Sequence, residues 1–467
     1  MDVFLKFLGG AKSVTGSKYL LEVGSKKILI DCGLFQGKKE LRLRNWYQLP
    51  LSPEEIDAVV LTHAHLDHSG YLPRLVKDGF KGPIYCTSAT RDLVEILLLD
   101  AGKLQEEEAE FAYKRGYSKH SRPQPLFSAA DAKPVLEFLR VIRFDQPLSL
   151  TENLSVTFRM AGHILGAALL EFDLQGDQQK KKLVFSGDLG RGSDPVMYPP
   201  TICTHADVLV VESTYGDRKN PIEEVENDLA NTIIEAAQRG GLVLIPAFAV
   251  GRTQNLIYYF HHLIERKRIP KIPIYIDSPM AISVTDLYER HAGVHKIKVE
   301  PGQNGLQSLF DDPNIHFCNT AESSKALNDL KKPGILISAS GMCTGGRILH
   351  HLYHRLGNEN DTLLFVGFQA EGTRGRDLLE GKKTIRIFGE DVPVKCHIKV
   401  VNGLSAHADQ QELLEWLGHF GNSPKFTFLT HGELSAATAL QQRIMEALGW
   451  RTFVPEYLES FELFTGI

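Results

Sequence analysis

Short runs of alternating apolar and polar residues open the chain and predict a meandering sheet. Three of them, VFLKFLGG, KYLLEV and KILIDCG, fall within residues 3–32 and are separated by Gly and Ser. Two buried strands are predicted next, DAVVLTH at 57–63 and PIYCTS at 83–88, followed by a long helix that begins near Arg91. After residue 140 strand-like runs dominate again, which indicates a second region rich in β-structure.

The pattern changes between residues 217 and 392, where apolar strands alternate with helices. Such a βα alternation is typical of a parallel sheet covered by helices. The predicted elements are a helix over 221–239, strand LVLIPAF, a helix from Arg252, strand IPIYIDS, and strand GILISAS followed by a helix from Thr344.

The last part of the chain returns to the first pattern. It contains the strand-like runs VKCHIKVV and KFTFLTHG and predicts helices near 410–419 and 435–447. We therefore expect an insertion, in which residues 1–216 and 393–467 form one domain and residues 217–392 form another.

Composition narrows the class of protein. With 467 residues, 43% of them hydrophobic and 23% charged, the chain is typical of a globular protein with more than one core. Its net charge of -5 would not attract an anionic polymer, so a nucleic-acid site must be locally basic. Runs of basic residues are more often solvated surface than nucleic-acid sites. The runs in this chain are Lys38, Lys39, Arg42 and Arg44, then Arg218 and Lys219, then Arg266, Lys267 and Arg268.

Cysteine usage and the N-terminus indicate the compartment. Six cysteines are dispersed without a C-x-x-C pair, which argues against a disulfide frame or a thiolate zinc site. The first residues lack the regions of a secretory signal, and no apolar run approaches the length of a membrane span. We therefore expect a cytoplasmic protein with no membrane partner.

A cluster of metal-binding residue types follows the apolar run DAVVLTH. The segment H-A-H-L-D-H places four donors within six residues. Alternation along an extended chain sends His63 and His65 to the same side, and the following turn can bring Asp67 and His68 toward a second metal. A solvated histidine-rich loop is the alternative, and the buried strand directly before the cluster makes it the weaker one.

Three further donors each end an apolar run: His163 in RMAGH, Asp188 in LVFSGD and His431 in FTFLTH. Singly, each would more often be an ordinary core, surface or turn residue. Together with the H-x-H-x-D-H cluster they supply seven N and O donors and no cysteine, which suits two Zn2+ ions per chain. A carboxylate can bridge the two ions and leave an open position for water.

These segments resemble the metallo-β-lactamase superfamily, and within it the β-CASP group of nucleases. The resemblance spans essentially the whole chain, with one departure at Asn255, where relatives often carry Glu. It implies an α/β fold, an αββα metallo-β-lactamase sandwich with an inserted parallel-sheet β-CASP domain. The segments that carry it are GGAKSVTGSKYLLE, ILIDCG, LTHAHLDHSGYLPRL, AGHILGA, FSGDLGR, ESTYGDR, GRTQ, SASGMCTGGR, LSAHAD and LTHGE.

The resemblance implies a role for each donor. A second carboxylate beside the ligands would orient the histidine cluster, as metal-bound imidazoles generally require. The implied ligands are His63, His65 and His163 for one zinc, Asp67, His68 and His431 for the other, and Asp188 for both, with Asp31 orienting the cluster.

Catalytic roles also follow from the resemblance. Glu212 matches the acidic first motif of the family, His407 the histidine of the second and His431 that of the third. We expect His407, held by Glu212, to protonate the leaving 3′-oxygen, and we count Asp67 with the catalytic residues. Two zinc ions about 3.5 to 4 Å apart would activate a bridging hydroxide, giving 3′-hydroxyl and 5′-phosphate ends.

A glycine-rich turn follows the predicted strand GILISAS and is a candidate phosphate site. Its amides and hydroxyls would meet phosphate at a helix N-terminus, and an arginine would add a charge-assisted donor. A turn of this kind is equally often only structural. The candidate residues are Ser340, Gly341, Thr344, Gly345, Gly346 and Arg347, together with Ser405 of the LSAHAD segment.

We therefore expect a zinc-dependent ribonuclease with single-stranded RNA as its partner, and a homodimer stays open. The chain shows neither the additional C-terminal domain nor the N-terminal RNA-binding domains of some relatives, which favours an endonuclease in RNA processing or decay. A DNA nuclease of the same group and a catalytically inactive RNA-binding scaffold are the alternatives. His431 favours RNA, because DNA-acting relatives typically lack this histidine, and the complete donor set favours an enzyme.

Overall fold

Two compact units make up the chain. We call residues 1–219 and 407–467 the sandwich unit and residues 220–406 the inserted unit. The computed structural model describes residues 1–115, 122–176, 179–220, 224–302, 305–369 and 372–466.

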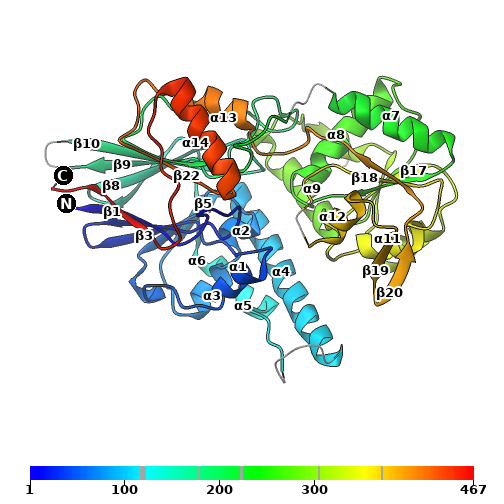
Figure 1. The fold of residues 1–467 in the computed structure, drawn as a ribbon, viewed down its shortest axis with the longest axis horizontal. Helices are drawn as coiled ribbons and strands as arrows, with labels where there is room; N and C mark the ends of the chain where they lie inside the picture. Colours follow the sequence, from blue (N-terminus) through cyan, green and yellow to red (C-terminus); the bar gives the residue numbers. More distant parts are fainter. Residues whose placement is uncertain (116–121, 177–178, 221–223, 303–304, 370–371, 467) are drawn as a thin grey trace. The chain divides into compact units, whose positions relative to one another are not determined.

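The first sheet of the sandwich unit contains both ends of the chain. In spatial order its strands are β23 (Ser460–Phe464), β1 (Val3–Phe7), β2 (Tyr19–Val23), β3 (Lys26–Ile30), β4 (Ala58–Val60), β5 (Ile84–Thr87) and β6 (Leu139–Ile142). β1 pairs with β23, and Figure 1 shows the two termini side by side. From β3 to β6 all neighbours are parallel, so their carboxyl ends lie at one edge of the sheet.

The second sheet of this unit has six strands. In spatial order they are β22 (Phe426–Thr430), β11 (Val208–Glu212), β10 (Lys180–Phe185), β9 (Ala168–Gln175), β8 (Leu154–Met160) and β7 (Pro147–Thr151). β22, β11 and β10 are parallel neighbours. β8 and β10 are both antiparallel to β9, so β8 runs in the same direction as β10.

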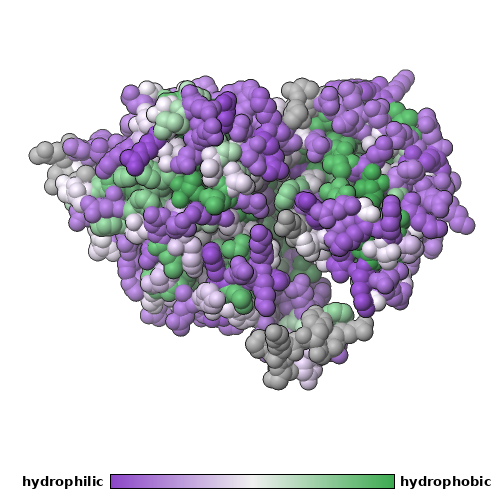
Figure 2. Space-filling view, in the orientation of Figure 1, coloured by the Kyte–Doolittle hydropathy of each residue, from purple (hydrophilic) through white to green (hydrophobic). Residues whose placement is uncertain are grey.

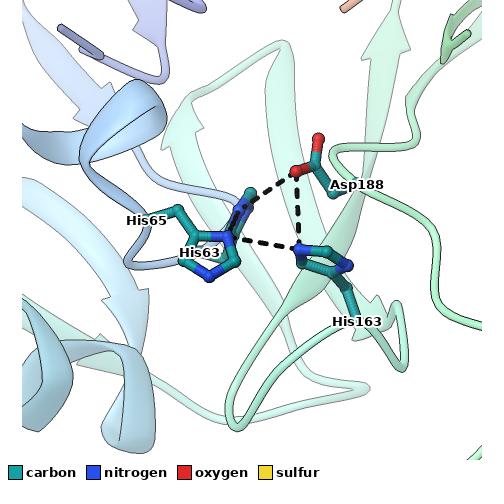
Figure 3. A group of neighbouring side chains, drawn as sticks. All are labelled: His63, His65, His163 and Asp188. Carbon is teal, nitrogen blue, oxygen red and sulfur yellow. Dashed lines mark hydrogen bonds and ion pairs between the residues drawn. The ribbon is translucent and has the colours of Figure 1, made fainter. Parts of the chain in front are cut away.

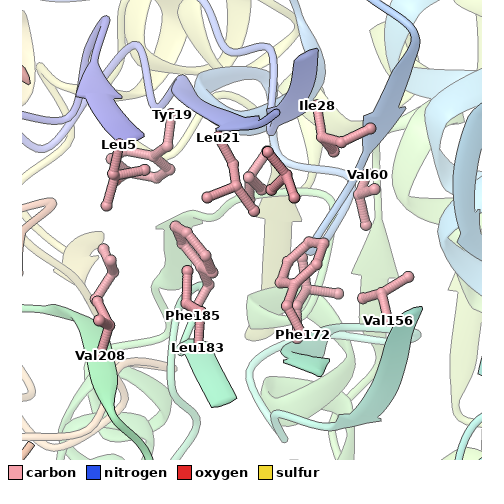
Figure 4. Packing of buried hydrophobic residues seen from close by; sticks show 14 of the residues in the cluster. Leu5, Tyr19, Leu21, Ile28, Val60, Val156, Phe172, Leu183, Phe185 and Val208 are labelled. Carbon is pink, nitrogen blue, oxygen red and sulfur yellow. The ribbon is translucent and has the colours of Figure 1, made fainter. Parts of the chain in front are cut away.

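A single hydrophobic core joins the two sheets. The rings of Phe172 and Phe185 lie in its centre, 5.6 Å apart in an edge-to-face arrangement. Burial of each large apolar side chain stabilises the fold by about 1.5–3 kcal/mol, which fixes the sheets against each other. Figure 4 shows Leu5, Tyr19, Leu21, Ile28 and Val60 of the first sheet facing Val156, Phe172, Leu183, Phe185 and Val208 of the second.

Helices cover the outer side of each sheet, which confirms the predicted αββα sandwich (Figure 1). The long helix predicted near Arg91 begins at Ser88 and contacts β5 and β6, while the last helix contacts β22. Beside the first sheet lie α1 (Lys39–Arg44), η1 (Pro53–Glu55), α2 (Leu66–Ser69), α3 (Leu72–Lys77), α4 (Ser88–Arg115), α5 (Ala129–Ala132) and α6 (Val135–Phe138), and beside the second lie α13 (Gln410–Leu417) and α14 (Leu434–Leu448).

The inserted unit contains the predicted parallel sheet. Its strands, in spatial order, are β16 (Ile315–Phe317), β13 (Ile274–Ile276), β17 (Gly334–Ser338), β12 (Leu242–Pro246), β18 (Thr362–Phe365) and β21 (His397–Val400). All five pairings are parallel. Because β21 pairs with β18, the compact unit continues to residue 406, past the predicted limit of 392.

Helices and small hairpins surround this sheet. The helix predicted over 221–239 is α7 (Val225–Gln238), and 221–223 lie outside the described residues. The helix predicted from Thr344 begins at Ile348 as α11 (Ile348–Arg355), because a tight turn precedes it. The other elements are α8 (Arg252–Glu265), α9 (Pro279–Arg290), η2 (Ala292–Val294), β14 (Glu300–Gly302), β15 (Gly305–Gln307), η3 (Leu309–Asp311), α10 (Ala321–Ala326), η4 (Leu327–Asp329), α12 (Arg374–Leu379), β19 (Thr384–Ile387) and β20 (Glu390–Pro393).

The surface drawn in Figure 2 is mostly hydrophilic, with patches of hydrophobic residues between the hydrophilic ones. Across the described ranges no helix combines the length and the apolar composition that crossing a bilayer requires.

Candidate metal centre

Six candidate site residues of the sandwich unit lie within three residues after a strand or at its last residue, while His65, Asp67 and His68 follow β4 in a loop and in helix α2. Within each sheet, the strands that precede these residues run in the same direction. Their carboxyl ends therefore lie at the same edge of the sheet. The residues and their strands are Asp31 after β3, His63 after β4, His163 after β8, Asp188 after β10, Glu212 at the end of β11 and His431 after β22.

The first cluster consists of His63, His65, His163 and Asp188 (Figure 3). His65 Nδ1 lies 3.2 Å from His63 Nε2 and 3.2 Å from His163 Nε2. Asp188 Oδ2 lies 3.4 Å from His63 Nε2 and 3.5 Å from His163 Nε2. A tetrahedral zinc with bonds of about 2.1 Å separates neighbouring donor atoms by about 3.4 Å. The four atoms are therefore spaced as the ligands of one zinc ion.

A second cluster contains Asp67, His68 and His431. His431 Nε2 lies 3.3 Å from Asp67 Oδ2, and His431 Nδ1 lies 3.4 Å from Asp188 Oδ1. His68 Nε2 lies 3.2 Å from the same oxygen of Asp188. The two oxygens of Asp188 therefore face different clusters, as a bridging carboxylate requires.

Asp188 itself supports a cation at this place. Its side chain is 1% exposed, and Oδ1 has no partner in hydrogen-bond geometry although two imidazoles lie nearby. Burial alone would raise the pKa of Asp188, but His431, His68 and His63 hold that pKa well below its ordinary range. A buried ionised oxygen without a hydrogen bond is costly, and a metal ion removes that cost.

The histidines of the first cluster are neutral at pH 7. Burial lowers the pKa of His63 to about 3, that of His65 below its usual value and that of His163 well below it. Metal ligation needs the neutral imidazole with a free lone pair. The folded chain therefore presents these rings in the form that binds a divalent metal.

Asp31 contacts Thr62 and His68 through its two carboxylate oxygens. It accepts hydrogen bonds from the backbone N–H of Thr62 at 2.7 Å and from the Thr62 hydroxyl at 2.8 Å, and His68 Nδ1 lies 2.7 Å away. With Nδ1 donating to Asp31, Nε2 of His68 faces Asp188, the arrangement that fixes a metal-binding tautomer. Asp31 has φ +57°, a strained value for a residue with a side chain that its three contacts maintain.

The sequence did not single out Thr62 or Thr214, and both contact candidate ligands. The Thr62 hydroxyl lies 3.0 Å from His63 Nδ1. The Thr214 hydroxyl lies 3.0 Å from His431 Nδ1 and donates to the His431 carbonyl at 2.9 Å. Thr62 directly precedes the histidine cluster, and Thr214 lies two residues after Glu212. Their positions beside these motifs were the signal by which the sequence could have identified them.

His407 and Glu212 form a pair beside the metal clusters. His407 Nδ1 lies 3.0 Å from Glu212 Oε2, whereas it lies 4.0 Å from Asp188 Oδ2, beyond the spacing of ligands on one zinc. Glu212 is fully buried and also accepts from the Leu189 N–H at 2.6 Å. Burial lowers the pKa of His407, but Glu212 and Asp188 outweigh it and raise that pKa to about 9. The arrangement suits a proton donor held by a carboxylate.

The candidate phosphate residues lie in the inserted unit, in the turn between β17 and α11. The Ser340 hydroxyl accepts from the N–H of Thr344 at 3.1 Å and of Gly345 at 3.3 Å, so these two amides already have partners. Gly341 lies under the ring of Phe248, and Gly346 has φ +76°. Ser405 is buried near the end of the same unit.

Arg347 braces this turn. Its Nη1 donates to Asp277 Oδ1 at 2.6 Å and to the Cys318 carbonyl at 2.8 Å. Asp277 is fully buried and also contacts His351 Nε2 at 2.6 Å and the Ser324 hydroxyl at 2.6 Å. Burial would raise the pKa of Asp277, and these three partners lower it instead. Phosphate binding by Arg347 stays a prediction, since its donors hold the fold together.

Models of three protein families match the chain. The metallo-beta-lactamase superfamily matches residues 14–247, the Beta-Casp domain residues 253–378, and the Zn-dependent metallo-hydrolase RNA specificity domain residues 391–455.

Curated relatives match over nearly the whole chain. Ribonuclease TTHA0252 of Thermus thermophilus is 38% identical over 92% of this chain and 94% of its own length. Transcription termination factor FttA of Methanosarcina mazei is 31% identical over 98% of this chain and 71% of its own. The RNase J-like protein of Methanocaldococcus jannaschii is 30% identical over 97% and 98%.

A crystal structure of a protein of unknown function from Enterococcus faecalis has the same fold. It is 14% identical, covers 99% of this chain and 100% of its own, and superposes with a TM-score of 0.54.

Replacing Arg347 by Ala should destabilise the protein, because the buried carboxylate of Asp277 loses one donor. We expect a loss of about 1–3 kcal/mol in the free energy of unfolding, seen as a lower thermal midpoint. Arg347→Lys should lose less, since it keeps the charge. The matched control is Arg376→Ala, which breaks an exposed pair with Glu380 and should change little. Equal losses in Arg347→Ala and Arg376→Ala would contradict the bracing role.

Proposed function

The chain belongs to the metallo-β-lactamase superfamily and contains its β-CASP domain, and on that premise we propose that it is a zinc-dependent ribonuclease. It cleaves single-stranded RNA by hydrolysis and leaves 3′-hydroxyl and 5′-phosphate ends. Relatives named ribonuclease and RNase J-like protein support this proposal, as does the RNA specificity domain matched at 391–455.

The spacing of the donor atoms around Asp188 is the observation that carries the proposal. Donor separations of 3.2–3.5 Å fit zinc without rearrangement of the first cluster. When bound, two zinc ions supply a water activated at neutral pH and positive charge beside the phosphoryl oxygens. The assigned ligands are His63, His65 and His163 for one ion, Asp67, His68 and His431 for the other, and Asp188 for both.

His407 is the proposed general acid. Attack of water on phosphorus breaks the bond to the 3′-oxygen, which must take up a proton as it leaves. The raised pKa of His407 keeps its imidazole protonated at neutral pH, and Glu212 holds the ring through Nδ1, so Nε2 can carry the transferred proton. Asp67 is partly exposed and can accept a proton from the attacking water.

RNA is favoured over the two alternatives. A DNA nuclease of the same group would typically lack a histidine at position 431, and an inactive scaffold has no need of a complete donor set. We propose endonucleolytic cleavage. The cytoplasm is the proposed compartment, because all six cysteines are free thiols, as in a reducing environment.

Cleavage should depend on the bound metal. His65→Ala removes an atom that lies 3.2 Å from two other donors, so bound zinc should fall and cleavage should drop at least about 10³-fold with loss of the activated water. Elemental analysis and digestion of labelled linear and circular single-stranded RNA measure both effects, and cutting of the circle identifies an endonuclease. The control is His205→Ala, an exposed histidine outside the site. Full activity in zinc-free His65→Ala would refute the mechanism.

His407→Ala should keep both metals and lose about 10²- to 10⁴-fold in kcat, the range for removing proton transfer. A substrate with sulfur in place of the 3′-oxygen needs little protonation on departure, so it should restore much of the mutant's rate relative to wild type. Parallel loss of metal and activity, or no selective recovery with sulfur, would mean that His407 has another role.

The alkaline side of the pH profile should report the same imidazole. The protonated acid is present below its pKa, so kcat should fall as pH rises through that value, and bound cations place the fall below pH 9. Glu212→Gln removes the charge that raises the pKa of His407, so the fall should move to lower pH. A profile identical in wild type and Glu212→Gln would contradict the pairing.

A further inference from the structure

A short segment beside the metal centre forms a closed loop on the sandwich unit. We call residues 36–47 the basic loop. At its base Asn45 is buried, and its side chain accepts from the Phe35 N–H at 2.9 Å and donates to the Phe35 carbonyl at 2.7 Å. These two hydrogen bonds close the loop, so its start and its end are held at the same place.

The base of the loop adjoins the second metal cluster. The Cys32 N–H donates to the His68 carbonyl at 2.7 Å, and the Leu34 N–H donates to the Leu66 carbonyl at 2.8 Å. A Cβ at Gly33 would lie 1.6 Å from the Asp67 carbonyl oxygen, so only glycine permits this approach. The backbone that leads into the basic loop is therefore packed against the backbone of two candidate ligands.

Positive charge on the loop faces solvent. Lys38, Lys39 and Arg42 are exposed, and none of the ion pairs within the described ranges uses them. Arg44 differs, because its guanidinium lies 4.1 Å from the ring centre of Tyr457 and anchors the loop. Residues 36–47 contain four cations and one acidic residue, Glu40, so in a chain with a net charge of -5 this loop is a local basic surface.

Two large aromatic side chains extend from the same loop. Trp46 is 51% exposed and Tyr47 is 58% exposed, directly after the buried Asn45. The other two tryptophans of the chain, Trp416 and Trp450, are buried. Exposed aromatic rings beside cations are the combination that binds single-stranded nucleic acid, since rings stack with bases and cations contact the backbone.

We propose that the basic loop binds the single-stranded RNA beside the cleaved bond, with Trp46 and Tyr47 stacking on bases and Lys38, Lys39 and Arg42 contacting phosphates. This inference rests on the proposed ribonuclease function and adds a substrate contact to it. The cations alone would suit RNA or an acidic protein surface. The exposed aromatic rings beside them favour RNA, because such rings stack on bases. The position of the loop favours RNA as well, because the backbone that leads into it packs against the backbone of Asp67 and His68.

Tryptophan fluorescence tests the stacking directly. In metal-loaded His407→Ala protein, which turns over slowly, a single-stranded oligoadenylate should quench the emission of the exposed Trp46. Trp46→Phe should bind with similar affinity and lose the quench. Joint replacement Trp46→Ala and Tyr47→Ala should weaken binding about five- to 150-fold for each lost stack. The control is Tyr113→Ala, which removes an exposed ring on α4 and should change nothing.

The salt dependence of binding tests the cations separately. Lys38→Gln, Lys39→Gln and Arg42→Gln together should lower the slope of log affinity against log salt by about 2. The inference is overturned if oligoadenylate binds without quenching, if the Ala pair binds it with unchanged affinity, and if the salt slope is unchanged in the Gln variant. Cleavage of RNA by the wild-type protein would still support the proposed function in that case. A changed oligomeric state in the variants with unchanged RNA affinity also overturns it, since the loop would then be a subunit interface. Absence of RNA cleavage by wild type overturns both.

Discussion

The buried carboxylate of Asp188 is the group on which the rest of the site depends. It is 1% exposed, and its two oxygens face imidazoles from two separate clusters at 3.2–3.5 Å. A charged carboxylate withdrawn from water is costly unless positive charge surrounds it. The imidazoles of His63 and His163 have lowered pKa values and are neutral at pH 7, so a divalent metal ion would supply much of that charge. Several donors must therefore surround Asp188. They follow strands that are far apart in the sequence and that end around this one point.

A rigid sandwich makes that convergence possible. The core between the two sheets fixes the strand ends, and residues at those ends take conformations that an isolated peptide would avoid. Asp31 and His431 both have positive φ values, +57° and +46°. Such strain costs on the order of 1–3 kcal/mol at each position and persists only where surrounding contacts maintain it. Here hydrogen bonds to Asp31 from Thr62, and from the His431 N–H to the Gly10 carbonyl at 2.7 Å, maintain it.

The two loops that carry positive charge differ in how their cations are used. In the inserted unit, Arg347 donates to a buried carboxylate and to two carbonyls, so its charge is neutralised within the fold. On the basic loop, Arg44 alone serves as an anchor, while Lys38 and Lys39 extend into solvent. Basic residues in a sequence therefore do not identify a nucleic-acid surface until their partners are known.

Much of the molecule followed from the chain alone. Continuous apolar runs in the middle indicated the parallel sheet, alternating runs at both ends indicated the sandwich, and donors at the ends of apolar runs marked the candidate metal residues, because strand periodicity and donor chemistry are local properties. The resemblance already implied that Asp188 serves both clusters, and the tertiary structure added the distances. Only the tertiary structure decided that Thr62 and Thr214 contact histidines and that Arg347 is engaged by Asp277. These contacts join residues dozens to hundreds of positions apart or depend on the rotamer of one side chain, and a linear pattern contains neither kind of information.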